Sequence, residues 1–163
     1  MDPLGLSSSS DIASRYISLI NKVKVAKFNR DEYNQAFNQL KGNGGFELLE
    51  IGVRPQGGQF TDLTRVSDDV EIVIRYRLTQ PHEKFWITMH MKNEQGERMF
   101  STYGGGRCYD YHHETGEYEQ ICHLPKDFFN WGTYAIDFMA FSQPSNIEVL
   151  LDEKDIVSYT LAN

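Results

Sequence analysis

Cysteine is scarce in this sequence, and long apolar runs are missing from it. Its two cysteines, Cys108 and Cys122, are too few for a disulfide framework and fit a reducing compartment, with a single bridge between them left open. No stretch approaches the roughly 18 apolar residues of a membrane span, and residues 1–10 lack the apolar core of a signal peptide. We therefore expect a cytoplasmic protein.

Basic residues are also in the minority. Sixteen Lys and Arg stand against 23 Asp and Glu, which gives a formal net charge of -7. Nucleic-acid backbones and anionic membrane surfaces bind a basic face, so neither is expected as the main partner. A neutral ligand suits this charge, whereas an anionic ligand would need a local cluster of Arg, Lys or His.

The residues that are abundant favour a single β-rich domain with an appendage. A chain of 163 residues buries one core, and its nine Tyr and ten Phe favour strands. Residues 1–10 end in a serine run and fit a flexible linker or a cloning remnant. From residue 11 to about Lys27, apolar side chains recur at helical spacing: Ile12, Tyr16, Leu19 and Val23. A shorter helical pattern, Tyr33, Phe37 and Leu40, stops at Gly42.

After the glycine cluster at 42–45 the apolar period changes from helical to alternating. The clearest strand is 70–78, where Val70, Ile72 and Ile74 alternate with more polar residues. Further strands are predicted at 85–92, 98–103, 118–124, 133–141, 147–151 and 156–161. The acidic residues Asp152, Glu153 and Asp155 are predicted to form a solvated turn before the last strand. Short strands at this spacing predict an all-β, antiparallel β-sandwich over residues 42–163.

An ordered series of short motifs resembles a known family. The series comprises Gly42, Asn43 and Gly44; Leu48 and Ile51; the segment 70–76; Asn93 and Gly96, followed by Met99 and Phe100; Leu124 and Pro125; Trp131, Gly132 and Tyr134; and the segment 155–159. Each motif is common by itself, but their order resembles the C-terminal carbohydrate-binding domain of Wzt, the ATP-binding subunit of O-antigen polysaccharide ABC transporters. Residues 11–16 are similar to the last helix of the ATPase portion, so 11–41 is interpreted as a helical connector from an upstream ATPase.

The resemblance implies an immunoglobulin-like sandwich that recognises the non-reducing end of an exported O-antigen polysaccharide. It also implies a homodimer formed by exchange of the last strand, a transmembrane transporter subunit as partner of the full-length protein, and a place at the inner face of the inner membrane. The chain has no Gly-rich Lys-Ser/Thr phosphate loop. We therefore expect a binding module without a cofactor of its own, with ATP bound by the missing upstream domain.

Two groups of residues have the composition of a glycan site, which combines aromatic platforms with planar polar side chains. The first is the outward row Trp86, Thr88 and His90, with Arg75 and Arg77 beside it if the two strands are neighbours. The second is the segment 103–113, with a glycine run that can bend around a ligand and the candidates Tyr103, Arg107, Tyr109, Tyr111 and His112. The alternatives are a row covered by the N-terminal helices or a second subunit, and a hairpin whose Tyr rings pack on the sandwich edge.

Other functions are weaker interpretations. A metal site at His112 and His113 with the cysteines is disfavoured, because adjacent strand residues point to opposite faces. A glycan hydrolase would pair Asp137 with a carboxylate such as Asp110 or Glu114, a pattern that many acidic domains contain by chance. A purely structural dimerisation sandwich explains the same strands, with Trp86 and the last strand at the interface.

Overall fold

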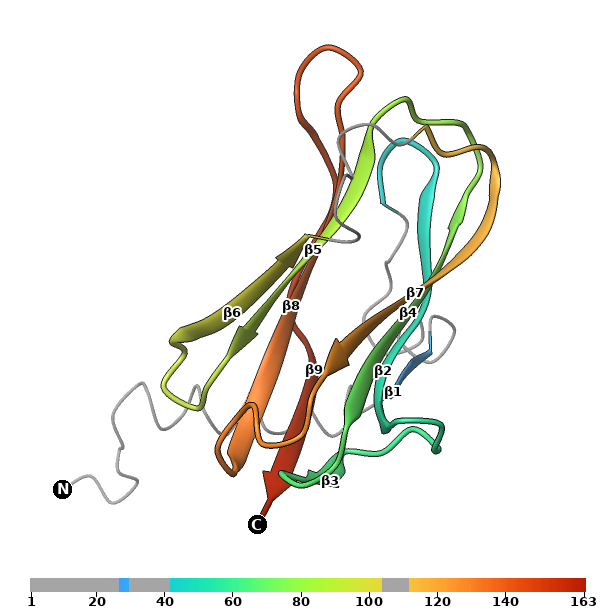
Figure 1. Cartoon of the computed structure of the whole chain (residues 1–163). Helices are drawn as coiled ribbons and strands as arrows, with labels where there is room; N and C mark the ends of the chain where they lie inside the picture. The colour runs from blue at the N-terminus through green and yellow to red at the C-terminus, as the bar shows by residue number, and fades with distance from the viewer. Residues whose placement is uncertain (1–26, 30–41, 104–111) are drawn as a thin grey trace, which may run out of the picture.

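The computed structural model describes residues 27–29, 42–103 and 112–163, and these form nine strands in two sheets that face each other (Figure 1). Sheet I has the order β1 (Lys27–Asn29), β2 (Phe46–Pro55), β4 (Val70–Leu78) and β7 (Gly116–Leu124). Sheet II has the order β3 (Leu63–Arg65), β9 (Glu148–Ala162), β8 (Gly132–Ser142), β5 (Phe85–Lys92) and β6 (Arg98–Tyr103). The predicted all-β sandwich is confirmed.

Two parts of the architecture depart from a simple antiparallel sandwich with a helical start. The short strand β3 runs parallel to the end of β9, whereas the other strand pairs are antiparallel. Residues 27–29, within the predicted helical connector, form β1 and pair with β2. The rest of the connector and residues 1–10 lie outside the described residues. In the described ranges no helix is long and apolar enough to cross a membrane.

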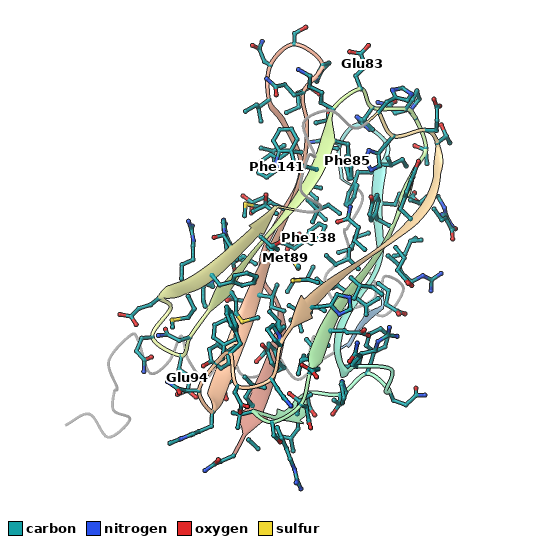
Figure 2. All side chains as sticks on the ribbon, viewed as in Figure 1. Glu83, Phe85, Met89, Glu94, Phe138 and Phe141 are labelled. Carbon is teal, nitrogen blue, oxygen red and sulfur yellow. The ribbon has the colours of Figure 1, made fainter. Side chains whose placement is uncertain are left out.

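The core lies between the sheets and follows from alternation along the strands. On β5, Phe85, Ile87, Met89 and Met91 are buried in the core, and the alternate side chains point to the outer face of sheet II. Figure 2 shows Phe85, Met89 and Phe138 between the two sheets. Because each sheet contributes one apolar face, burial of these faces drives the packing of the sandwich.

The predicted strands at 70–78, 85–92 and 98–103 are confirmed with their bounds as β4, β5 and β6. The prediction of a turn at Asp152, Glu153 and Asp155 is wrong, because residues 148–162 form one strand, β9. The acidic stretch forms a β-bulge within this strand. Ile136 pairs with Val157 but Phe138 pairs with Glu153, so the intervening residues of β9 are extra to the register. Asp155 adopts a positive φ of 51° within this bulge, a conformation that Asp tolerates better than most residues.

Two Gly-x-Tyr motifs form matching corners at the starts of β7 and β8. The Tyr118 hydroxyl donates to the carbonyl of Glu114 at 2.6 Å, and the Tyr134 hydroxyl donates to the carbonyl of Asn130 at 2.9 Å. A hydrogen bond from Tyr to the backbone a few residues upstream is the tyrosine corner of Greek-key sandwiches. The glycine two residues before each Tyr has a φ near 150°, which a larger residue rarely adopts.

Candidate functional site

The structure separates the predicted row of site residues into two groups. Arg75 and Arg77 lie on β4 in sheet I, and Trp86 and His90 lie on β5 in sheet II. On both strands the alternate residues form the core, so these four side chains are on the two opposite outer faces of the sandwich. The expectation that the arginines lie beside Trp86 and His90 is therefore wrong.

Arg77 is engaged in a cross-strand ion-pair network. Its guanidinium lies 2.9 Å from Glu47 on β2 and 2.6 Å from Glu117 on β7. These contacts raise the pKa of Arg77, and its hydrogen bond lowers the pKa of the Glu117 carboxyl. Arg75 is exposed and stands opposite Glu119 in the strand register, without a hydrogen bond or an ion pair to the part of the chain that the structure describes. Of the two arginines, Arg75 has the guanidinium that is free to bind a ligand.

The row on β5 is buried rather than open to solvent. The Trp86 side chain is 6% exposed and stacks on Phe141 of β8 with ring centroids 5.2 Å apart. His90 is also buried, and its Nδ1 lies 2.7 Å from the Ser101 hydroxyl oxygen on β6. Burial and then the charge of Arg98 lower the pKa of His90. The prediction of a solvent-facing Trp86 is therefore wrong, and this row belongs to the packing of sheet II.

The second candidate segment joins the two sheets. It leaves sheet II at Tyr103, the last residue of β6, and enters sheet I with β7. Arg107, Tyr109 and Tyr111 lie outside the described residues, as do Cys108 and Asp110, so their roles stay predictions. The side chain of Tyr103 is likewise not described. The segment therefore connects β6, an edge strand of sheet II, with β7, an edge strand of sheet I.

The two adjacent histidines of this segment diverge. His112 is exposed and pairs with Glu114, whereas His113 packs between Phe85 and Tyr118, with ring centroids 4.9 and 5.2 Å away. Residues 42–103 and 112–163 contain no cluster of His, Cys, Asp and Glu that could hold a metal ion. His112 therefore remains a candidate for hydrogen bonding to a ligand, and His113 has a packing role.

A cleft of about 230 Å³ lies between edge strands β6 and β7. Its lining residues are Ile74, Ile87, Met89, Thr102, Gln120, Ile121 and Cys122. Core side chains form an apolar floor, and Thr102 and Gln120 supply hydrogen-bonding groups. The Gln120 amide donates to the Tyr76 hydroxyl at 3.3 Å, and burial raises the pKa of the free Cys122 thiol. Sequence reasoning missed this cleft; the signal was the polar character of Gln120 at an inward position of a strand.

The hydrolase interpretation does not fit the surroundings of Asp137. Its carboxylate is buried and lies 2.9 Å from the Lys92 ammonium. It also accepts a hydrogen bond from the backbone N–H of Asp155. The other described candidate, Glu114, is on the connection before β7 and pairs with His112. Asp137 is thus held by structural contacts rather than directed at a substrate.

Comparison with known proteins gives a likeness of fold. No family model and no curated protein matches the sequence. A solved structure described as the crystal structure of the C-terminal domain of Wzt matches with a TM-score of 0.64 and 16% sequence identity, over 75% of this chain and 76% of that chain. The chain has the fold of the Wzt C-terminal domain. An alkylpurine DNA glycosylase, AlkC of Pseudomonas fluorescens bound to abasic-site DNA, aligns with a TM-score of only 0.47 and 8% identity, over 96% of this chain and 43% of that chain.

Proposed function

We propose that this chain recognises the non-reducing end of an O-antigen polysaccharide, without catalysis, as part of an ABC transporter that exports the polymer. The fold likeness to the Wzt C-terminal domain carries the proposal. It agrees with the ordered motifs of the sequence, which resemble the same domain. Several of these motifs have structural roles in the sandwich, such as the corner at Gly132 and Tyr134.

The cleft between β6 and β7 has suitable chemistry for the end of a glycan. Sugar rings present C–H faces to apolar side chains and hydroxyls to planar polar groups. The cleft offers both, with apolar surface from the partly exposed Ile121 and Cys122 and polar groups from Thr102 and Gln120. Its volume of about 230 Å³ is below the roughly 300–1,000 Å³ of drug-sized ligand sites, which favours a chain end over a longer stretch of polymer. The candidates Arg107, Tyr109 and Tyr111 belong to the segment that joins the flanking strands.

The proposal includes a homodimer formed through the last strand, with the transmembrane subunit as partner of the full-length protein at the inner membrane. Figure 1 shows the β8–β9 hairpin projecting beyond the other strands. Ile147 and Val149 in this arm are 61% and 47% exposed. Exposed apolar side chains on a projecting arm are suited to contact with a second copy.

Calorimetric titration with O-polysaccharide, with and without its terminal modification, tests the proposal. We expect the unmodified chain to bind the polymer with the intact terminus more tightly. Gln120→Ala should weaken binding by about tenfold, because it removes a hydrogen-bonding group from the cleft. Glu119→Ala, on the outer side of the same strand, is the matched control and should bind normally. Absence of binding to either polymer would contradict the proposal.

A structural dimerisation sandwich without glycan binding is the second candidate. The buried stack of Trp86 and Phe141 supports it, because the predicted glycan platform on sheet II is occupied by packing. The titration separates the two candidates when it is combined with a measurement of mass by light scattering. A dimer that binds neither polymer would support the structural role.

A further inference from the structure

A second concavity lies at the end of the sandwich where β2 and β7 end and β4 begins, on the other side of β7 from the cleft. We call it the Asp69 groove; it has a volume of about 340 Å³ and is lined by Gln56, Asp69, Val70, His123, Leu124 and Pro125. These residues come from three places that meet there: the end of β2, the start of β4 and the end of β7. None of the predicted site residues belongs to it.

The walls of the groove are fixed to each other by hydrogen bonds that backbone N–H groups donate. The N–H of Gln56 donates to the carbonyl of Asp69 at 2.8 Å, and the N–H of Lys126 donates to Oδ1 of Asp69 at 2.9 Å. A third bond, from the N–H of Asp127 to the carbonyl of Val66 at 2.7 Å, ties the same two loops together. A ligand therefore meets a groove whose walls are already held in place, which lowers the entropy cost of binding.

The polar groups of the groove match a hydroxylated ligand. Oδ2 of Asp69 and the side-chain amide of Gln56 have no hydrogen-bond partner among the described residues, and His123 is largely exposed with its Nδ1 3.6 Å from Glu71. A carboxylate, an amide and an imidazole together accept from and donate to neighbouring hydroxyls. Pro125 supplies the exposed apolar surface on which a sugar ring can rest, and Val70 and Leu124, which also line the groove, are buried core residues.

The charge of the groove selects against acidic sugars. The buried Glu71 is compensated by Arg54, whose Nε lies 2.7 Å from its carboxylate. Asp69 has no such cation among the described residues, so it leaves the groove negative. A uronic acid or a phosphorylated sugar would be repelled, whereas a neutral hexose would not.

The groove and the cleft between β6 and β7 are neighbours along one strand. Gln120 and Cys122 face the cleft, whereas His123 points to the opposite face of this edge strand and lines the groove, so a polymer would reach both sites by crossing the edge of β7. Three residues of a strand span about 10 Å. We propose that the Asp69 groove is a second subsite, which holds internal neutral sugars of the same polymer whose end occupies the cleft. This inference rests on the proposed function.

Binding of O-polysaccharide fragments, graded in length from the terminal monosaccharide to several repeat units, tests the second subsite. Asp69→Asn keeps the Oδ1 that accepts from Lys126, so the loop contact is retained. We expect the affinity of the unmodified chain to rise with fragment length, and Asp69→Asn to lose about tenfold for the long fragments only. Asp62→Asn removes the same charge from the nearby loop and should bind all lengths normally.

The possible outcomes distinguish the two proposals. If Asp69→Asn binds every fragment as the unmodified chain does, the second subsite is wrong and the proposed function stands. If Asp69→Asn weakens the terminal monosaccharide as much as the long fragments, the groove is not a separate subsite for internal sugars, and the inference is also wrong. If no fragment of any length binds, both the inference and the proposed function are wrong.

Discussion

The backbone N–H of Asp155 donates a 2.9 Å hydrogen bond to Oδ1 of Asp137 on the neighbouring strand. The ammonium of Lys92 lies 2.9 Å from the carboxylate of Asp137 and 2.9 Å from the carboxylate of Asp155. Together the three residues hold the bulge at which three residues of β9 face one residue of β8. These contacts explain how Asp155 remains inside a sheet, because Lys92 of β5 neutralises its charge together with that of Asp137.

Replacement of Lys92 by Met should therefore destabilise the fold. Burial disfavours the charge of Lys92, but the hydrogen bonds to Asp137 and Asp155 outweigh it and raise its pKa. The stabilising contribution is thus present at neutral pH and lost only as the pH rises through this raised pKa. At pH 7 we expect Lys92→Met to cost roughly 1–3 kcal/mol, because Asp137 is left buried without its cation. Urea denaturation measures this cost.

Lys154→Met is the matched control for this prediction. Lys154 and Asp152 form an ion pair at 3.3 Å on the surface of β9, and both side chains are about half exposed. A surface pair of this kind contributes at most about 1 kcal/mol. Equal destabilisation by the two variants would contradict a special role for Lys92.

The stability of the fold should fall on acidification through His90. Its pKa in the folded state is lowered by burial and by Arg98, below the value of 6.5 of a free imidazole. The unfolded chain therefore binds the proton more readily, so stability is full above pH 6.5 and decreases as the pH falls through 6.5 toward the folded pKa. We expect His90→Gln to lose less stability than the unmodified chain between pH 7 and pH 5, measured by denaturation at each pH.

A second variant checks the cause of this pH dependence. Arg98→Met removes the positive charge near His90 but leaves the imidazole in place. The loss of stability on acidification should become smaller than in the unmodified chain, because the largest electrostatic cause of the lowered pKa is gone, while burial and the charge of Lys154 remain. An unchanged pH profile in both variants would show that His90 does not control it.

Trp86 and Arg75 should behave as a structural residue and a surface residue, respectively. Trp86→Ala removes a buried ring that stacks on Phe141 and should cost roughly 3–5 kcal/mol of stability. Arg75→Ala should change stability by no more than about 0.5 kcal/mol. If Trp86→Ala left stability unchanged but removed binding to O-polysaccharide, the result would support the glycan-binding role of Trp86 that the sequence predicts.

The sequence predicted the strands well where alternation is regular and poorly where a distant residue decides the structure. On β4 and β5 the local pattern alone specifies which side chains enter the core. The continuity of β9 depends on Lys92 and Asp137, which are far away in the sequence. The placement of Arg75 and Trp86 on opposite faces depends on strand order, because consecutive strands β4 and β5 belong to different sheets. The cleft at Gln120 was missed for the same reason.

The tyrosine corners should contribute measurably to stability. Tyr134→Phe removes a hydrogen bond to the backbone of Asn130 and should cost roughly 0.5–1.5 kcal/mol by urea denaturation. Tyr159→Phe is the matched control, since its hydroxyl donates to the sulfur of Met91, a weak acceptor, at 3.4 Å. Tyr159→Phe should therefore cost less. The reverse order would show that the corner does not stabilise the start of β8.

The projecting β8–β9 hairpin should control the oligomeric state if the chain forms the proposed homodimer. Ile147→Glu places a charge at the most exposed apolar position of this arm, so a second copy could bury the arm only by desolvating that charge. Light scattering coupled to size exclusion should show a smaller dimer fraction at equal concentration. Met99→Glu, at an exposed apolar position on β6, is the control and should leave the dimer fraction unchanged. Because Ile147 is exposed within one chain, both variants should keep the unfolding midpoint of the monomer, and loss of folding in Ile147→Glu would instead assign the arm to the core of its own sandwich.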